Sequence, residues 1–232
     1  MDDLVKPKSD SISKTRKITS KPTGIQARFE EAKAMQSNPA EMPNRIGLML
    51  DASSSMFEYE GTATREELLK SALQGFIQAC NFQDTAVAMY QFPDNANFSL
   101  CTSKVVTEIN ASLLETGGDT PMFTCMRAML NREPITRGII ISDGQATDYV
   151  HEDIVMPHYI ESRIPVDCIH IGSAQGGEKT LREIATLTGG IYIKFSEAAK
   201  LVSALKYLTP AYRALLESGD AAALLGADEV KK

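Results

Sequence analysis

The sequence predicts an α/β protein with a doubly wound, mostly parallel sheet that carries helices on both faces. Two observations predict this fold class. From Arg45 onward, short apolar runs alternate with stretches whose apolar residues recur at three- and four-residue steps, the spacing of an amphipathic helix. The apolar runs are nearly continuous, which is typical of parallel strands that are covered on both faces.

Strands and helices are expected to follow one another along the chain. The expected strands are Ile46–Leu50, Val87–Phe92, Gly138–Ile141, Val166–Ile171 and Ile191–Phe195. The expected helices are Arg65–Cys80, Met122–Asn131, Glu152–Ser162, Glu178–Leu187 and Glu197–Leu208. Thr64 is placed as an N-cap residue of the first helix, and Gly189-Gly190 as the C-cap of the fourth. A short antiparallel strand at Asn97–Cys101 is expected to add an edge to the sheet.

The length of 232 residues indicates one domain with extensions at both ends. Residues 44–208 are expected to form that domain. Residues 1–43 are expected to be a flexible tail with a short helix, because residues 1–24 are rich in Lys, Ser, Thr and Pro and offer little apolar surface to bury. Residues 209–232 are expected to be a helical extension with a loose acidic end.

The overall charge and the hydropathy pattern argue against two classes of partner. A formal net charge of −6 argues against generic nucleic-acid binding, which favours a basic face. No apolar stretch follows the first Met, and no run approaches the length of a membrane span. We therefore expect a cytoplasmic protein that binds neither nucleic acid nor a membrane.

The cysteines are expected to be reduced thiols. Cys80, Cys101, Cys125 and Cys168 lie far apart in the sequence and form no C-x-x-C pair. Three of them lie in or beside apolar runs, where a free cysteine packs like a small hydrophobic residue. A disulfide among them is the alternative.

Three polar segments supply oxygen side chains at the ends of apolar runs or in a glycine-rich turn. Asp51-Ala52-Ser53-Ser54-Ser55 directly follows the first expected strand, and Asp143 follows the third, after Ser142. Thr120 lies in Gly117-Gly118-Asp119-Thr120-Pro121. Ligands collect at the carboxyl ends of parallel strands, and an oxygen-only set suits a hard divalent cation such as Mg²⁺. We therefore predict a metal site that consists of Asp51, Ser53, Ser55, Thr120 and Asp143.

These segments and their order resemble the metal-ion-dependent adhesion site of von Willebrand factor A (VWA) domains. The resemblance covers roughly residues 44–208 and implies a Rossmann-like VWA fold. It also implies hydroxyls that contact the metal directly and aspartates that often act through water. The chain departs from the family pattern at Asp119, where Gly or another small residue is commoner. That carboxylate changes the charge of the site and hence its ligand preference.

The charge of the predicted site favours recognition over turnover. Only Asp51 and Asp143 among the five residues are ionised, so a doubly charged cation keeps much of its field and an exchangeable position. An Asp or Glu carboxylate of a partner protein is its natural ligand. We expect a non-enzymatic interaction module that uses Mg²⁺, with Mn²⁺ as the alternative ion. The resemblance implies an intracellular stand-alone adaptor or assembly component, for example one that serves an AAA+ ATPase.

Acidic residues beside the motif permit two interpretations. Asp119, Glu58 and Glu60 lie next to its segments in the sequence. They are either solvated loop charges or part of the rim of the site. In the second case they lower the local potential and weaken the binding of a carboxylate partner.

Other functions are weighed against the interaction module. A magnesium-dependent phosphate hydrolase at the same rim would need a phosphate clamp, and Lys104, Arg127 and Arg65 are candidates without a recognisable pattern. A degenerate scaffold with an empty site is the third hypothesis. The segment Gly172–Thr180 is not a Walker loop, because Glu178 stands where that loop requires Lys. The serines lack a G-x-S-x-G elbow, and the three histidines lack metal-ligand spacing.

Overall fold

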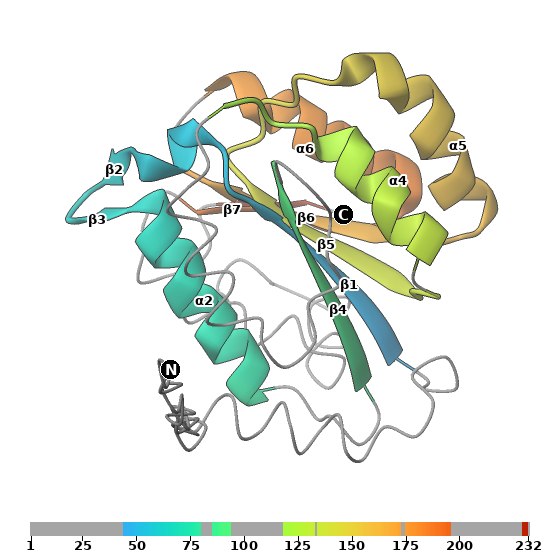
Figure 1. Cartoon of the computed structure of the whole chain (residues 1–232), viewed down its shortest axis with the longest axis horizontal. Helices are drawn as coiled ribbons and strands as arrows, with labels where there is room; N and C mark the ends of the chain where they lie inside the picture. Colours follow the sequence, from blue (N-terminus) through green and yellow to red (C-terminus); the bar gives the residue numbers. More distant parts are fainter. Residues whose placement is uncertain are drawn as a thin grey trace, which may run out of the picture.

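The computed structural model describes residues 44–79, 85–93, 118–132, 134–172, 175–195 and 229–231. Within these residues one six-stranded sheet has the order β4-β1-β5-β6-β7-β8 (Figure 1). Its strands are β1 (Asn44–Asp51), β4 (Thr85–Phe92), β5 (Arg137–Ser142), β6 (Val166–Ile171), β7 (Tyr192–Phe195) and β8 (Glu229–Lys231). All neighbours pair in parallel except β7 and β8, which are antiparallel. The predicted mostly parallel sheet is confirmed.

Helices cover both faces of this sheet, as a doubly wound fold requires. Figure 1 shows α2 (Arg65–Ala79) on one side and α4 (Met122–Arg132), α5 (Glu152–Glu161) and α6 (Gln175–Thr188) on the other. Strand β1 lies between β4 and β5, so the chain winds to one side of β1 first and to its other side later. The carboxyl end of β1 is therefore the topological switch point, where ligands bind in such sheets.

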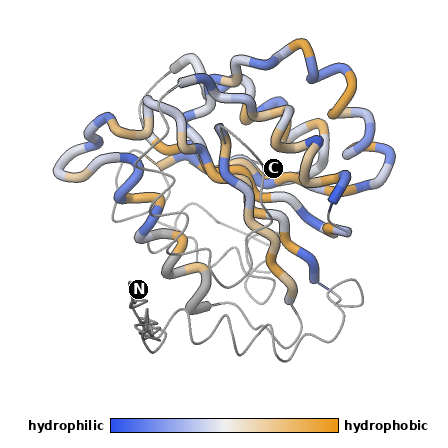
Figure 2. The backbone as a smooth tube through the Cα atoms, in the orientation of Figure 1, coloured by the Kyte–Doolittle hydropathy of each residue, from blue (hydrophilic) through white to orange (hydrophobic). Residues whose placement is uncertain are grey.

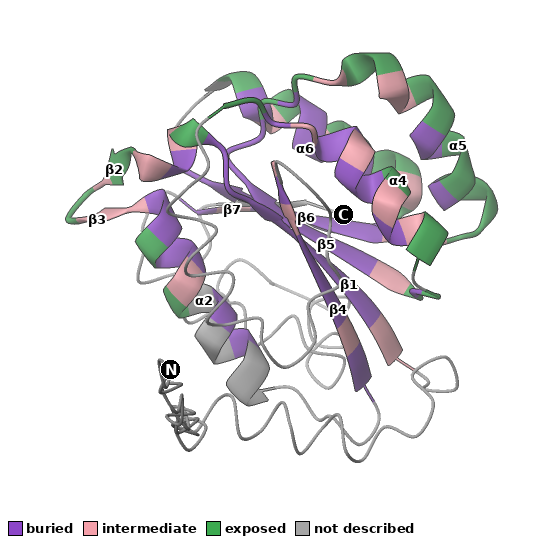
Figure 3. Cartoon of the chain, in the orientation of Figure 1, coloured by how far each residue is buried: buried purple, intermediate pink, exposed green. Residues whose placement is uncertain are grey.

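The core explains why the strand sequences are continuously apolar. Met49, Ile140 and Cys168 belong to one buried cluster with residues of α4, α5 and α6. Leu48 and Ile139 are equally buried, and by the alternation of a strand they point to the opposite face, the side of α2. Figure 2 shows hydrophobic residues along the strands, and Figure 3 shows that these strands are largely buried while the outer sides of the helices are exposed.

All five expected strands and four of the five expected helices are present in the described residues. The largest shift is in α6, which begins at Gln175 rather than at Glu178. Gly176 and Gly177 read as loop residues in the sequence, but the packing described below favours glycine in this first helical turn. The expected helix Glu197–Leu208, the expected strand Asn97–Cys101 and the tail of residues 1–43 lie outside the described residues.

The antiparallel edge strand of the described sheet is β8, near the end of the chain. Its residues Glu229–Lys231 pair with Tyr192–Lys194 of β7. The expected loose acidic end is therefore wrong for these three residues. Without β8, β7 would be the edge strand and would offer unpaired backbone groups. An extended segment satisfies such groups whatever its local composition.

A two-stranded hairpin between the 3-10 helix η2 (Ser54–Phe57) and α2 was not expected. It consists of β2 (Tyr59–Glu60) and β3 (Ala63–Thr64), which pair in an antiparallel fashion. Gly61 in the turn has φ of 72°, a conformation that glycine adopts without strain. The hairpin projects from the sheet beside the carboxyl ends of its strands (Figure 1).

The first turn of α2 forms a reciprocal capping box. Thr64 Oγ1 accepts a hydrogen bond from Glu67 N at 3.2 Å, and Glu67 Oε2 accepts one from Thr64 N at 2.9 Å. The N-cap role predicted for Thr64 is confirmed, and Glu67 completes the T-x-x-E pattern. The C-cap predicted at Gly189-Gly190 is also confirmed. Helix α6 ends before Gly189, whose φ is 74°, and Gly190 N donates to Ala185 O at 2.8 Å.

We expect Thr64→Ala to lower the free energy of unfolding by about 1 kcal/mol, because one N–H in the first turn of α2 loses its acceptor. Urea denaturation followed by circular dichroism measures the change. Thr64→Ser keeps the hydroxyl and is the matched control, with a loss well below that of Thr64→Ala. Equal losses for both substitutions would contradict the capping role.

Two of the four cysteines can be placed. Cys125 and Cys168 are free and buried, and burial raises the pKa of both thiols. Cys80 and Cys101 lie outside the described residues.

In the parts of the chain that are described, no helix combines the length and the apolar character needed to cross a membrane.

Candidate metal centre

Asp51 ends β1 at the topological switch point, and its side chain is fully buried. Its Oδ1 accepts a hydrogen bond from Ser53 N at 2.8 Å, and its Oδ2 accepts one from Ser142 Oγ. Burial raises the pKa of Asp51 from 3.8 to about 6, because these hydrogen bonds offset only part of the lost hydration and Asp143 adds repulsion. A cation beside Asp51 would supply the missing compensation.

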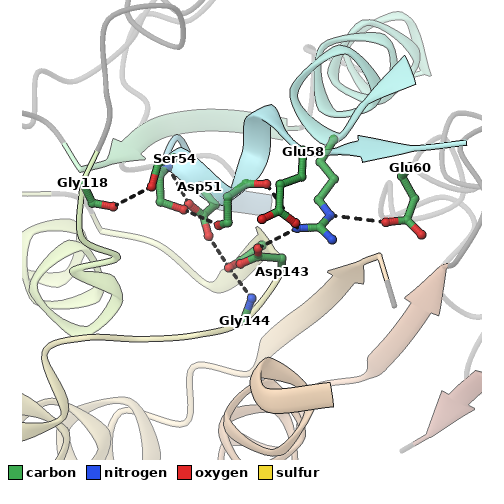
Figure 4. Close-up of polar contacts among 11 residues, drawn as sticks. Asp51, Ser54, Glu58, Glu60, Gly118, Asp143 and Gly144 are labelled. Carbon is green, nitrogen blue, oxygen red and sulfur yellow. Dashed lines mark hydrogen bonds and ion pairs between the residues drawn. The ribbon is translucent and has the colours of Figure 1, made fainter. Parts of the chain in front are cut away.

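The 3-10 helix η2 brings the hydroxyls of Ser53 and Ser55 together. Ser53 Oγ and Ser55 Oγ are 3.0 Å apart. Ser54, between them, is exposed and places its Oγ 3.5 Å from Gly118 O in another loop. The hydroxyls of Ser53 and Ser55 thus lie side by side, while Ser54 turns toward the loop that carries Thr120 (Figure 4).

Asp143 lies beside Asp51 because β5 is the parallel neighbour of β1, with Ile141 opposite Leu50. Ser142 links the two strand ends: its hydroxyl donates to Asp51 Oδ2 and accepts from Gly144 N at 2.8 Å. The carboxylate of Asp143 is buried, and no described residue hydrogen-bonds to its Oδ1. A buried carboxylate oxygen without a partner is costly, so this atom fits a role as a ligand to a cation or to its water.

Thr120 is buried in a loop that is tied to the segment after Asp143. Thr120 N donates to Thr147 Oγ1 at 3.0 Å, and Thr147 N donates to Thr120 O at 3.0 Å. Next to it, Asp148 accepts hydrogen bonds from the N–H groups of Phe123 and Thr124 in the first turn of α4. The loops that carry Thr120 and Asp143 are therefore held together as one unit.

Arg65, the first residue of α2, brings a positive charge into the same region. Its Nη1 lies 3.1 Å from Asp143 Oδ2, 3.0 Å from Glu58 Oε2 and 3.1 Å from Ser55 O. Its Nε lies 3.4 Å from Glu60 Oε2. The three carboxylates Glu58, Glu60 and Asp143 turn toward this buried guanidinium (Figure 4).

The acidic rim residues differ in their surroundings. Glu60, at 14% side-chain exposure, pairs with Arg65, and Glu58 does so too although 66% of its side chain is exposed. The interpretation as a solvated loop charge is therefore wrong for Glu60, whereas the side chain of Glu58 is exposed as that interpretation expects, although it also pairs with Arg65. Asp119 is exposed, as that interpretation expects.

Close backbone packing fixes the Asp143 loop from behind. A Cβ added at Gly177, in the first turn of α6, would lie 2.0 Å from Asp143 O, and one at Gly144 would lie 2.4 Å from Gly177 O. The glycines that superficially suggest a phosphate loop thus serve helix packing. Gly144 also has φ of 97°, which favours glycine independently.

The donor set fits a hard divalent cation. The described residues contain no group of three His, Cys, Asp or Glu placed to hold a metal. A cation at this edge would depend on the serine and threonine hydroxyls together with Asp51 and Asp143. Such neutral and anionic oxygens are ligands that Mg²⁺ and Mn²⁺ accept.

Sequence reasoning did not assign site roles to Ser142 and Arg65. Ser142 occupies the S-D-G segment, but its bond to Asp51 depends on strand pairing. The sequence suggests Arg65 only as a candidate phosphate clamp, yet four oxygen atoms of the protein surround its guanidinium. One signal was readable: a basic residue is unfavourable in the first turn of a helix. Arg127, a second clamp candidate, is exposed on α4, and Lys104 lies outside the described residues.

No protein-family model matches the sequence, and no curated protein matches it either. Solved structures are similar in fold. An aerotolerance-related membrane protein from Bacteroides fragilis matches with a TM-score of 0.51 and 17% identity, over 70% of this chain and 96% of that chain. The SpRpn10 VWA domain matches with 0.54 and 14%, over 72% and 95%. The TFIIH p34 N-terminal domain matches with 0.50 and 16%, over 73% and 99%.

At such identities the similarity shows the fold alone. The strand order, the helices on both faces and these matches define a VWA-type α/β fold. The chain spans nearly the whole of each of the three matched chains, so the similarity concerns a complete domain.

Proposed function

We propose that this protein is a divalent-cation-dependent interaction module. Mg²⁺, or Mn²⁺ in its place, would be held by the hydroxyls of Ser53, Ser55 and Thr120 together with Asp51 and Asp143. The bound cation would supply a Lewis-acidic position for an Asp or Glu carboxylate of a partner protein. We further propose that the module is a cytoplasmic adaptor or assembly component without enzymatic activity, for which an AAA+ ATPase is one candidate partner.

One observation carries this proposal: two buried aspartates lie at adjacent strand ends, and among the described residues only Asp143 of the two has a basic partner, Arg65, which it shares with Glu58 and Glu60. Asp51 is fully buried with a raised pKa, and Asp143 keeps a buried Oδ1 without a described hydrogen-bond partner. Two serine hydroxyls lie 3.0 Å apart in the segment that follows Asp51. Burial of anionic oxygens is costly without a counter-ion, and a cation bound among these oxygens would offset part of that cost.

Each residue would have a separate task. Ser142 and the N–H of Ser53 orient the carboxylate of Asp51. The Thr147 and Asp148 contacts hold the Thr120 loop against the loop after Asp143. Because hydroxyl ligands carry no charge, the cation would keep the positive field that attracts a carboxylate from outside.

We expect Ser53→Ala to weaken Mg²⁺ binding by at least about tenfold, since even outer-shell partners of metals cost about 10- to 100-fold. Isothermal calorimetry and the rise in Tm on adding Mg²⁺ measure the effect. Ser54→Ala is the matched control, because Ser54 is exposed and faces Gly118. The proposal fails if wild type shows no Mg²⁺ response, or if both variants respond like wild type.

Partner binding is tested separately. A pull-down with the full chain, repeated in EDTA and with Ser53→Ala, should lose the same proteins under both conditions. A partner retained equally with EDTA and with Ser53→Ala would show that capture does not depend on the cation.

Two further experiments test the rest of the proposal. Fractionation of the source cells would test the cytoplasmic assignment, and phosphate esters with and without Mg²⁺ would test the absence of hydrolase activity.

A further inference from the structure

We propose that Arg65 is a built-in counter-cation of the metal centre, which shares Asp143 with the divalent cation and thereby limits how tightly that cation binds. This inference rests on the proposed function, since it concerns the same site. It assigns to Arg65 a role in setting metal affinity, distinct from metal ligation.

The geometry divides the carboxylate of Asp143 between two tasks. Its Oδ2 is 3.1 Å from Arg65 Nη1, and the side chains of both residues are 6% exposed. Its Oδ1 is buried and has no described hydrogen-bond partner. One oxygen therefore belongs to the guanidinium, while the other remains for a cation or its water. Because so little solvent reaches this pair, its charges are weakly screened. The positive charge of Arg65 would therefore weaken the net attraction of the Asp143 carboxylate for a divalent cation, and a bound cation would weaken its attraction for Arg65.

The placement of Arg65 has no explanation in helix stability. It occupies the first position of α2, where the helix dipole favours acidic residues, and Glu66 and Glu67 follow it. Burying its guanidinium also costs hydration free energy, which only paired charges offset. The carboxylates of Asp143, Glu60 and Glu58 provide that pairing. Arg65 is therefore held by the metal-site charges rather than by its helix.

The surroundings fix Arg65 in this position. Ser55 O accepts from Nη1 at 3.1 Å, which links Arg65 to the backbone of a predicted metal ligand. Gly172, directly after β6, leaves room for the side chain, because an added Cβ would lie 2.7 Å from Arg65 Nε. Arg65 N also donates to Glu58 O at 3.1 Å, which ties the start of α2 to the base of the hairpin.

Arg65→Gln removes the charge and keeps a side-chain donor. We expect the Kd of this variant for Mg²⁺ to fall by about tenfold or more relative to wild type, because the positive charge 3.1 Å from Asp143 Oδ2 no longer competes with the cation for that carboxylate. Its Tm without cation should fall, since Asp143 and Glu60 lose their counter-ion, and Mg²⁺ should restore it. Calorimetry and thermal denaturation by circular dichroism measure both effects.

Two matched variants separate charge from general damage. Arg65→Lys keeps the charge and should bind Mg²⁺ within about threefold of wild type. Arg163→Gln makes the same change in net charge at an exposed position. Arg163 precedes the amino end of β6, whereas the candidate site lies at the carboxyl ends of the strands, so this variant should leave the Kd unchanged. An unchanged or raised Kd in folded Arg65→Gln would overturn the inference.

A measurement on wild type keeps the inference testable if Arg65→Gln does not fold. The ¹⁵Nε and ¹⁵Nη resonances of Arg65, assigned by their disappearance in Arg65→Lys, should shift during an Mg²⁺ titration with the calorimetric midpoint. Those of Arg163 should not move. A titration that saturates without moving the Arg65 resonances would overturn the shared role of Asp143.

The outcomes also separate this inference from the proposed function. If wild type binds no Mg²⁺ but Arg65→Gln does, the proposed function fails and Arg65 stands as the cation that blocks the site. If neither folded protein binds Mg²⁺ or Mn²⁺, both proposals are overturned. If Arg65→Gln binds more weakly than wild type, metal binding stands and Arg65 is instead a residue that positions Asp143.

Discussion

Gly177→Ala is expected to lower the free energy of unfolding by about 3 kcal/mol, the upper range for an overpacked interior. The added Cβ would lie 2.0 Å from Asp143 O and 2.5 Å from Gly144 Cα, both of them backbone atoms. Neither side can yield without moving α6 away from the sheet or displacing the Asp143 loop. Urea denaturation measures the loss, and Mg²⁺ binding should weaken with it because Asp143 moves.

The neighbouring residue provides the control for this prediction. A Cβ at Gly176 would meet only the side chain of Gln145, an exposed residue, whose nearest atom lies 2.4 Å away. That side chain can rotate aside, and Ala favours a helix over Gly by about 1 kcal/mol. Gly176→Ala should therefore leave stability unchanged or raise it slightly. Equal losses for both variants would show that helix α6, rather than its contact with Asp143, is sensitive to alanine.

Asp51→Asn is expected to have opposite effects with and without a cation. Without a cation at pH 7.5, the variant should be more stable than wild type by about 2–3 kcal/mol, because one pKa unit corresponds to about 1.4 kcal/mol. The pKa of Asp51 is 3.8 when unperturbed and about 6 in the fold, where burial disfavours its charge. With Mg²⁺, wild type should gain stability and Asp51→Asn should not.

The pH dependence gives the sign of this effect. A raised pKa means that the folded state holds the proton of Asp51 more tightly than the unfolded state does. The stability that this proton contributes is fully present below pH 3.8 and is lost as the pH rises to about 6. The difference in unfolding free energy between Asp51→Asn and wild type, measured in EDTA, should grow across this window. A constant difference from pH 4 to 7.5 would contradict the raised pKa.

The sequence indicated the elements well, because their signals are local. The apolar run Val166–Ile171 coincides with β6, and the T-x-x-E pattern at Thr64 and Glu67 forms the cap it describes. The boundary of α6 was less readable, since Gly176 and Gly177 have low helix propensity but lie in its first turn. The hairpin at Tyr59–Thr64 was missed because two-residue strands carry almost no periodic signal.

The candidate site was only partly readable. The oxygen side chains of Asp51, Ser53, Ser55, Thr120 and Asp143 could be selected from residue type and position at strand ends. The residues that contact and orient these side chains could not be selected in this way, because they come from distant segments of the chain. Ser142 lies 91 residues from Asp51, and Asp143 lies 78 residues from Arg65. Such contacts depend on which strands are neighbours and in which register, and no local pattern encodes either.

Short segments of the sequence specify strands that are buried on both faces and oxygen side chains at the ends of those strands, because hydrophobic periodicity and side-chain chemistry are local properties. Which charged side chains meet at those strand ends depends on how distant segments pack against one another. Placing β1 between β4 and β5 brought Asp51 next to Asp143. Packing α2 and α6 beside them added the guanidinium of Arg65 and the close contact at Gly177. Electrostatic energy depends on distance in space, so the balance of charge at this site follows from the fold and not from the motif alone.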